Sequence, residues 1–235
     1  MSLLLQMKRL GGLTLDLLFP KSCVGCGKEG ELICGRCQRS MVKLVPPICP
    51  KCGRPQASGV LCPACVGWDS RIDGIRSPFR FEGVARQAVH QLKYRNLRIL
   101  AGPLGELMSD YLVTMPVPSD MLVPVPLHPK RLRERGYNQS ELLAREIGKL
   151  TSIPVVSDGL MRRKYAPPQA RTTSVEHRRA NLANAFAATG QHFKDSRVLL
   201  IDDVATSAAT LEACAKAVKE GGAASVWGLV MAREI

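Results

Sequence analysis

The sequence predicts an α/β protein in which a parallel β-sheet carries helices on both faces and follows a small cysteine-rich module. Short apolar runs alternate with helical patterns over residues 120–235, which is typical of strand–helix–strand units that cover both faces of a parallel sheet. Eight of the nine cysteines lie between Cys23 and Cys65. We therefore expect two domains, the cysteine-rich module over residues 1–68 and the sheet domain over residues 69–235.

The first segment, residues 10–19, is apolar but short. It contains Asp16 and lacks an Ala-x-Ala-type cleavage site, and no run of about 18 apolar residues occurs in the chain. This pattern predicts a short amphipathic helix, and it indicates neither a signal peptide nor a membrane span. We expect a cytoplasmic protein.

Four Cys-x-x-Cys pairs define the module: Cys23/Cys26, Cys34/Cys37, Cys49/Cys52 and Cys62/Cys65. Two thiolates three positions apart reach one tetrahedral ion from a tight turn, so four pairs predict two structural zinc ions. The spacing admits interleaved as well as consecutive pairing. Four disulfides would need an oxidising compartment, to which nothing directs this chain. An iron–sulfur cluster is a weaker alternative, because no Cys-x-x-Cys-x-x-Cys run occurs.

The sheet domain begins with a short strand at 79–81 and a helix at 84–97, where apolar residues recur at helical spacing. Pro103 can start the next helix, which continues through Leu112. The apolar stretch 122–127 predicts a strand whose prolines give it a rigid exit. A helix follows over about 140–150.

The second half continues the alternation of elements. A short strand is expected at 154–156 and a helix at 176–186, followed by an apolar strand at 198–201. The helix 208–220 stops at Gly221-Gly222 and leads into the last strand, 225–231. Cys214, alone in that helix, is most simply a small buried hydrophobe.

The clearest functional pattern lies where the strand 198–201 ends on two adjacent carboxylates. A turn of small and hydroxyl residues then leads into helix 208–220. Backbone N–H groups at a helix N-terminus bind phosphate, and carboxylates accept hydrogen bonds from sugar hydroxyls or help to hold Mg²⁺. An ordinary strand and capped helix is the alternative. The candidate catalytic residues are Asp202 and Asp203, and the candidate phosphate loop is Val204, Ala205, Thr206, Ser207, Ala208, Ala209 and Thr210.

The net charge of +13 indicates an anionic partner such as nucleic acid or phosphate. Two basic stretches, residues 128–139 and the proline-containing loop 161–173, concentrate this charge. They could contact a pyrophosphate group or a nucleic-acid backbone, although a solvated helix face is the ordinary alternative for a charge run. The candidate contact residues are His128, Lys130, Arg131, Arg135, Asn138, Gln139, Arg162, Arg163 and Lys164.

The segment around Asp202 and Asp203 resembles the signature of type I phosphoribosyltransferases that binds phosphoribosyl pyrophosphate (PRPP). In that family, two acidic residues precede a Thr-Thr-Gly-x-Thr loop, and the resemblance implies that the acidic pair holds the ribose hydroxyls while the loop holds the 5′-phosphate. Thr206 and Thr210 match, and Ser207 keeps a hydroxyl. Ala208 departs from the family's glycine, and its Cβ could crowd the phosphate.

A longer series of motifs in a distinctive order resembles the ComF family of bacterial competence proteins. The series comprises Leu18 to Cys23, the cysteine pairs, Gln91-Leu-Lys-Tyr94, Val123 to His128, Arg135 to Ser140, Pro168-Gln169, residues 178–186 and the two aspartates with their loop. The resemblance covers nearly the full length. It implies a double zinc ribbon joined to a phosphoribosyltransferase-type domain, acting in the cytoplasm in the uptake of single-stranded DNA.

Two functions are compatible with the sequence. The first is a PRPP-binding protein that uses Mg²⁺ and, if it turns over, transfers the phosphoribosyl group to an acceptor. The second is a non-catalytic zinc-ribbon protein that binds nucleic acid on the same fold. Single-stranded DNA and a helicase or other DNA-processing protein are the expected macromolecular partners.

Overall fold

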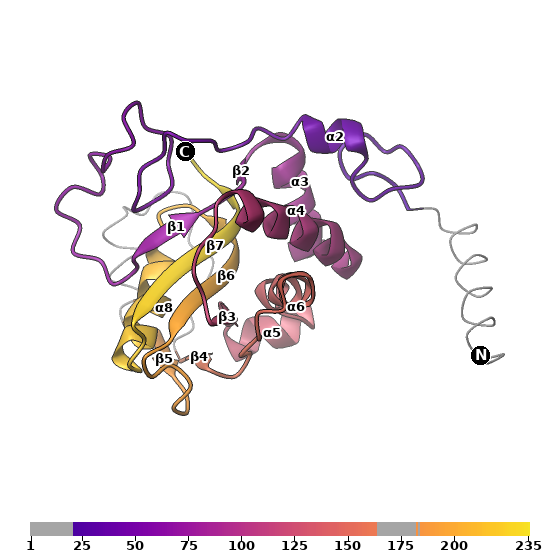
Figure 1. Ribbon diagram of the computed structural model, residues 1–235. Helices are drawn as coiled ribbons and strands as arrows, with labels where there is room; N and C mark the ends of the chain where they lie inside the picture. The colour runs from indigo at the N-terminus through magenta and orange to yellow at the C-terminus, as the bar shows by residue number, and fades with distance from the viewer. Residues whose placement is uncertain (1–20, 164–181, 183) are drawn as a thin grey trace.

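The centre of the fold is a strand that is buried on both faces. In the computed structural model, which describes residues 21–163, 182 and 184–235 (Figure 1), this strand is β6 (Arg197–Ala205). Val198 and Leu200 belong to one hydrophobic cluster, and Leu199 and Ile201 belong to another. Alternate side chains therefore face opposite layers.

The main sheet is parallel, as predicted. Its strand order is β1 (Gly74–Arg76), β7 (Ser225–Arg233), β6 and β3 (Met121–Pro124), and β2 (Phe79–Arg80) pairs with the far end of β7. Residues 154–156 contribute only a bridge from Val155 to Leu122.

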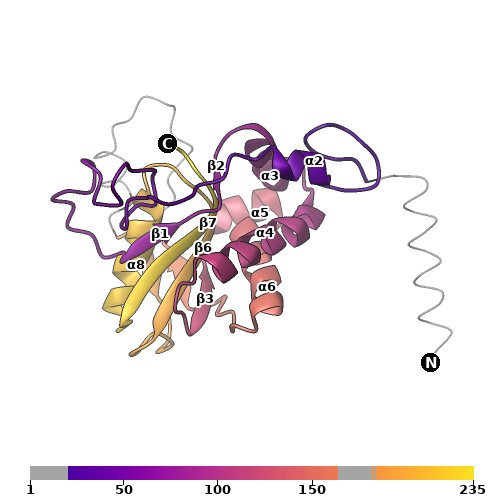
Figure 2. The ribbon, with the colours of Figure 1, turned by 45° about the horizontal axis from the view of Figure 1, so that its top comes forward.

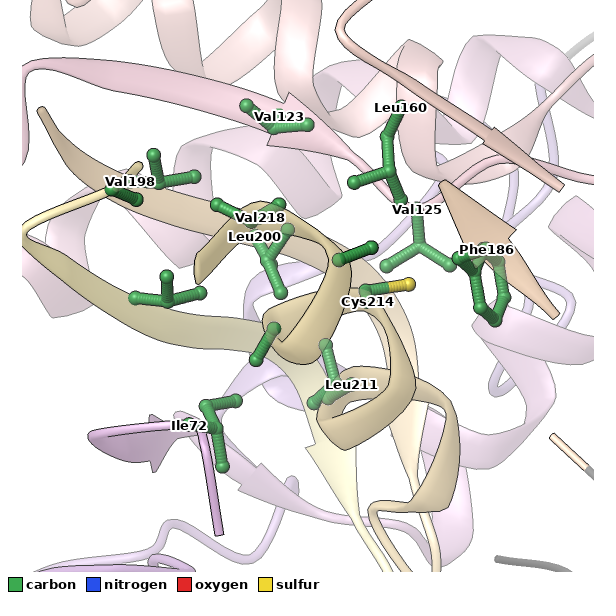
Figure 3. Close-up of a cluster of buried hydrophobic side chains, with 14 of the residues drawn as sticks. Ile72, Val123, Val125, Leu160, Phe186, Val198, Leu200, Leu211, Cys214 and Val218 are labelled. Carbon is green, nitrogen blue, oxygen red and sulfur yellow. The ribbon is translucent and has the colours of Figure 1, made fainter. Parts of the chain in front are cut away.

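Helices cover both faces of the sheet (Figure 2). One face carries α8 (Ala209–Glu220), and the other carries α3 (Gly83–Tyr94), α4 (Ala101–Thr114) and α6 (Gln139–Thr151), with the short 3₁₀ helix η1 (Arg98–Leu100) between α3 and α4. Figure 3 shows the cluster beneath α8, where Leu211, Cys214 and Val218 pack against strand residues. Cys214 is fully buried there, as a small core residue.

The strand that carries the acidic pair is longer than predicted. The apolar run 198–201 suggested that the strand stops before Asp202, but β6 continues to Ala205 because β7 supplies parallel hydrogen-bonding partners up to Arg233. Both aspartates are therefore strand residues, and α8 begins at Ala209. Similarly, α3 ends at Tyr94 rather than at Leu97.

Two other predictions in the second half were wrong in the part that the structure describes. Phe186 was expected in a helix and residues 161–162 in a loop, but β5 (Phe186–Ala188) and β4 (Leu160–Arg162) form an antiparallel pair. Burial of Leu160 and Phe186 in the cluster beneath α8 favours this pairing over the local helical pattern. The predicted helix at 10–19, Lys164 and most of the loop 161–173 lie outside the described residues.

The basic stretch 128–139 contains a short helix, α5 (Pro129–Arg135). The ring nitrogen Nδ1 of His128 accepts a hydrogen bond from the Lys130 amide at 3.2 Å and caps this helix. Pro129 lies in the first turn, where proline is favoured, and Gly136 ends the helix with a left-handed φ of 77°.

The cysteine-rich module runs along one side of the sheet domain. Its helix α2 (Gly35–Arg39) lies near α3, and the following residues reach the edge formed by β1 (Figures 1 and 2). No helix in the described part of the chain has both the length and the apolar character needed to cross a bilayer.

Packing of β1 against β7 gives a direct test of the fold. A Cβ added to Gly74 would lie 2.2 Å from ring atom Cζ3 of Trp227, whereas a Cβ on Gly102, in the first turn of α4, would meet open space. We expect Gly74→Ala to lower the free energy of unfolding by about 1–3 kcal/mol and Gly102→Ala to be neutral or stabilising, as measured by urea denaturation. A Gly74→Ala variant as stable as the parent would contradict this register.

Candidate functional site

Asp202 and Asp203 lie at the carboxyl end of β6, where parallel sheets place their ligand sites. The Oδ1 atom of Asp202 accepts hydrogen bonds from the Ser140 hydroxyl at 2.8 Å and from the Asp203 amide at 2.9 Å. Asp203 continues the face of Leu199 and Ile201, toward α3, and its Oδ1 pairs with Nζ of Lys93 at 2.9 Å. The carboxylates thus face different helices.

Burial makes this acidic pair electrostatically unusual. Asp202 is 8% exposed and Asp203 is 2% exposed. Burial, reinforced by the negative charge of Asp203, raises the pKa of Asp202 to about 7, against the opposing effect of Lys93 and of the Ser140 hydrogen bond. Burial would by itself lower the pKa of Lys93, but the two carboxylates raise it above its ordinary value. Lys93 therefore stays charged as the counter-ion of the pair.

One oxygen of the acidic pair has no partner. Among the described residues, Oδ2 of Asp203 is buried without a hydrogen bond. A buried acceptor without a partner costs about 1–3 kcal/mol, so a ligand that brings a hydroxyl group or a cation to this oxygen would be favoured. The carboxylate oxygens are also the donor type that Mg²⁺ prefers, so the residues fit this ion.

The loop after β6 enters α8 through a left-handed residue. Ala208 has a φ of 62° and is 5% exposed, and it belongs to the hydrophobic cluster beneath α8. Thr206, Ser207 and Thr210 remain partly exposed around it. The left-handed conformation favours glycine, the residue that the phosphoribosyltransferase signature has at this position, over alanine. The loop and the 12-residue helix α8 together present N–H groups suited to an anion.

Cations from three elements are coupled to the acidic pair, directly or through a neighbouring cation. Lys93 of α3 pairs with Asp203. Burial lowers the pKa of Arg162 in β4, the charge of Arg131 in α5 lowers it further, and Asp202 opposes this effect. Positive charge of this kind suits a ligand with phosphate groups next to hydroxyl groups.

A pocket of about 630 Å³ has Lys93 and Arg131 in its wall. It is lined by Lys93, Tyr94, Asn96, Arg131, Glu134, Arg135 and Tyr137. Tyr94 is 65% exposed, and the guanidinium of Arg135 lies 5.5 Å from the centre of its ring. The pocket therefore combines cations with an accessible aromatic face.

Some of the predicted contact residues have structural partners. The amide of Asn138 donates to the Val125 carbonyl at 3.0 Å, and its Oδ1 accepts from the Ser140 amide at 3.1 Å, which caps α6. Asn138 thus orients Ser140 beneath Asp202. Gln139 accepts a hydrogen bond from Arg135. His128 caps α5, while Lys130 and Arg163 are exposed.

Lys93 was not among the residues predicted for the site. Its signal in the sequence was the motif Gln91-Leu-Lys-Tyr94, but a lysine near the end of an amphipathic helix is ordinarily solvated. Only the packing of α3 against the sheet brings its side chain to Asp203.

The cysteine-rich module contains two groups of four sulfur atoms. The groups are Cys23, Cys26, Cys34 and Cys37, and Cys49, Cys52, Cys62 and Cys65, and the sulfurs in each lie within 4.8 Å of one another. The pairing is therefore consecutive. The sulfurs of Cys26 and Cys34 are 3.7 Å apart and those of Cys52 and Cys62 are 3.6 Å apart, far longer than a disulfide bond and close to the ~3.8 Å edge of a zinc tetrathiolate. Both groups fit structural zinc.

Each group repeats the same local structure. The Cys34 amide donates to the Cys23 sulfur at 3.3 Å, and the Cys62 amide donates to the Cys49 sulfur at 3.4 Å. Burial would raise the pKa of Cys23 and Cys49. The hydrogen bonds from the Cys34 and Cys62 amides, together with those from neighbouring backbone N–H groups, instead lower both pKa values to about 6. Thiolates stabilised in this way are ready to bind a metal.

The comparisons with known proteins agree with this organisation. A model of the double zinc ribbon domain matches residues 14–66. Competence protein ComFC of Bacillus subtilis is 28% identical over 88% of this chain and 86% of its own length. Competence protein F of Haemophilus influenzae is 28% identical over 89% of this chain and 96% of its own. The DNA utilization protein YhgH of Salmonella typhi is 28% identical over 83% and 87%.

A partial likeness to a solved structure was also found. Glutamine PRPP amidotransferase from Bacillus subtilis matches with 19% identity and a TM-score of 0.39, over 55% of this chain and 26% of its own. The match therefore spans about a quarter of that enzyme.

The fold and the sulfur groups define an α/β protein with a parallel sheet and an N-terminal double zinc ribbon. Within that class, the relatives confirm the resemblance to the ComF family: the chain is similar to two competence proteins over most of its length.

The raised pKa of Asp202 predicts a pH-dependent stability. Between about pH 4 and pH 7 the folded protein retains a proton here that the unfolded chain has released, so this group makes the fold less stable as pH rises. From about pH 6 to pH 8, the release of this proton lowers the free energy of unfolding by an amount on the order of 1 kcal/mol. We expect this contribution to be missing in Asp202→Asn, as measured by urea denaturation across the pH range.

Asp120→Asn is the matched control. The hydrogen bonds from Arg197 lower the pKa of Asp120 to about 2, so this carboxylate does not titrate near neutral pH. Identical pH profiles for Asp202→Asn and the parent would show that Asp202 is ionised throughout.

Proposed function

We propose that this protein binds PRPP together with Mg²⁺ at Asp202, Asp203 and the loop 206–210, and that it serves the uptake of single-stranded DNA in the cytoplasm. The observation that carries the proposal is the buried acidic pair next to a loop that enters α8 in a left-handed conformation. One oxygen of the pair lacks a partner in the part of the chain that the structure describes. The names of the relatives support a role in competence and DNA utilization.

The chemistry of PRPP matches the parts of this site. Ribose hydroxyls can donate to the carboxylates, and the 5′-phosphate can accept hydrogen bonds from loop N–H groups and hydroxyls. Lys93 pairs with Asp203 and shares a pocket wall with Arg131, and the charge of Asp202 acts on Arg162. These cations can face the pyrophosphate. Bound Mg²⁺ would neutralise pyrophosphate charge, with Asp202 and Asp203 as its protein ligands.

The same cations would favour a transfer reaction. The bond from ribose C1 to pyrophosphate oxygen breaks while an acceptor nitrogen bonds to C1, and negative charge grows on the leaving group. Fixed cations that face this charge lower the barrier. Pyrophosphate release in the presence of an acceptor would extend the proposal from binding to catalysis.

Nucleic-acid binding without turnover is the second candidate, and the pocket beside Tyr94 favours it. An exposed aromatic ring flanked by Arg131 and Arg135 offers a stacking face and backbone contacts for a single strand. A helicase or another DNA-processing protein is the partner we propose for the zinc ribbons.

Calorimetric titration of PRPP with Mg²⁺ tests the site. We expect Asp203→Ala to weaken binding at least about tenfold, because the substitution removes the oxygens that would accept from the ribose hydroxyls and hold Mg²⁺. Asp120→Ala, which removes a carboxylate at the opposite end of β6 beside Arg197, should bind as the parent does. Equal losses in both variants would argue against a specific site.

Ala208→Gly tests whether the departure from the family pattern closes the site. Glycine relieves a left-handed alanine by about 1 kcal/mol but loses a buried methyl group worth about 0.8 kcal/mol, and the methyl lies in the core cluster. We therefore expect PRPP affinity to change less than about threefold, as measured by calorimetry. A gain of tenfold or more would show that the methyl group crowds the phosphate.

A further inference from the structure

The first Cys-x-x-Cys turn of each sulfur group, residues 23–28 and residues 49–54, is called a knuckle here. The two knuckles have equivalent structures but end in different surroundings. In the first, the Gly27 amide donates to the Cys23 carbonyl and the Cys23 amide donates to the Lys28 carbonyl, each at 2.8 Å. In the second, the same two bonds join Gly53 to Cys49 at 2.9 Å and Cys49 to Arg54 at 2.7 Å. Lys28 and Arg54 therefore occupy corresponding positions.

Lys28 is exposed, but Arg54 reaches the candidate phosphate loop. Its Nη2 atom lies 3.5 Å from the carbonyl oxygen of Thr206, at the long end of a hydrogen bond, although the two residues are 152 positions apart. Arg54 is partly buried, and its Nε atom is fully enclosed without a partner among the described residues. A cation is therefore held beside the loop that would bind a phosphate.

The second knuckle is fixed to the edge of the sheet. The Ile75 amide of β1 donates to the Lys51 carbonyl at 2.8 Å, and the Arg76 guanidinium donates to the Pro50 carbonyl at 3.0 Å. Gly53 approaches the Ile75 carbonyl so closely that a Cβ would lie 2.6 Å from its oxygen. This knuckle thus sets where Arg54 stands relative to β1.

A second buried cation links the same sulfur group to β6. Arg233 of β7 is 2% exposed and pairs in the sheet with Ala205, directly before the loop. Burial lowers the pKa of Arg233, and the nearby sulfurs of Cys52 and Cys65 oppose this effect, while its Nε and Nη1 atoms have no hydrogen-bond partner among the described residues. Four thiolates around one Zn²⁺ carry a net charge of −2, which Arg233 and Arg54 can balance.

We propose that Arg54 is a positioning residue for the phosphate loop, and that the second cysteine group, when it holds zinc, keeps Arg54 in place. The inference rests on the proposed binding of PRPP at this loop. Arg54 fixes the Thr206 carbonyl and adds positive charge beside the 5′-phosphate. Without metal, Cys49 and Cys52 lose the ion that ties them to Cys62 and Cys65, and the knuckle that carries Arg54 loosens. The first sulfur group, whose Gly25 packs beside Val84 of α3, lacks this role.

The test compares corresponding positions of the two knuckles in the zinc-loaded, full-length protein. Arg54→Ala and Lys28→Ala each remove one positive charge, and Arg54→Lys is the conservative variant. PRPP with Mg²⁺ is titrated by calorimetry, and zinc per chain is measured by elemental analysis. We expect Arg54→Ala to keep two zinc ions but to bind PRPP about three- to tenfold more weakly. Lys28→Ala should match the parent, and Arg54→Lys should recover part of the loss.

A second pair of variants tests the role of the metal. We expect Cys62→Ser and Cys34→Ser each to lower the zinc content toward one per chain, but only Cys62→Ser to weaken PRPP binding, at least as much as Arg54→Ala does. If Arg54→Ala binds as tightly as Lys28→Ala, or if Cys34→Ser weakens binding as much as Cys62→Ser, the inference is wrong while the proposed function stands. No binding by the parent chain overturns the proposed function and this inference together.

Discussion

Burial of β6 on both faces is the constraint on which the rest of the structure depends. A parallel strand hydrogen-bonded to β3 and β7 and covered by helices on both sides has no freedom to shift. Everything at its carboxyl end inherits that rigidity, including Asp202 and Asp203, which are strand residues. The candidate site therefore rests on a strand with seven of its nine residues buried, and only the loop after it needs to adapt to a ligand.

The same burial creates an electrostatic conflict that the surrounding cations only partly resolve. Two adjacent carboxylates repel each other in a medium that solvates them poorly, which is why the pKa of Asp202 rises to about 7. Lys93 compensates one charge, and Ser140 stabilises the other carboxylate. Within the described part of the chain, one oxygen of Asp203 is left without a partner. Apolar side chains would fill such a buried position at a lower cost to the fold, and this is why the proposed ligand is one that supplies hydroxyl groups and positive charge.

The sequence indicated the acidic pair at the end of a strand, the turn that leads into α8 and both sulfur groups, because each is carried by neighbours along the chain. Cys-x-x-Cys spacing is a local property of a turn, and the apolar run before Asp202 is a local property of a strand. Lys93 and Arg54 were missed because their roles depend on contacts with Asp203 and Thr206, far away in sequence. The hairpin of β4 and β5 was missed for a similar reason, since the burial of Phe186 overrides a helical pattern.

The contrast between the two knuckles shows how a repeated motif acquires a specific role. Their internal hydrogen bonds are the same, so zinc stabilises both in the same way. They differ in what the knuckle touches. A Cβ on Gly27 of the first would meet no described residue within 4 Å, and the nearby Gly25 meets a side chain of α3. A Cβ on Gly53, the counterpart of Gly27, would meet the backbone of β1. Backbone contact and the buried Arg233 fix the second knuckle to the sheet at the level of the loop. A side-chain contact to a helix can yield without moving the sheet. The second ribbon is therefore better understood as part of the wall of the candidate site than as a separate appendage.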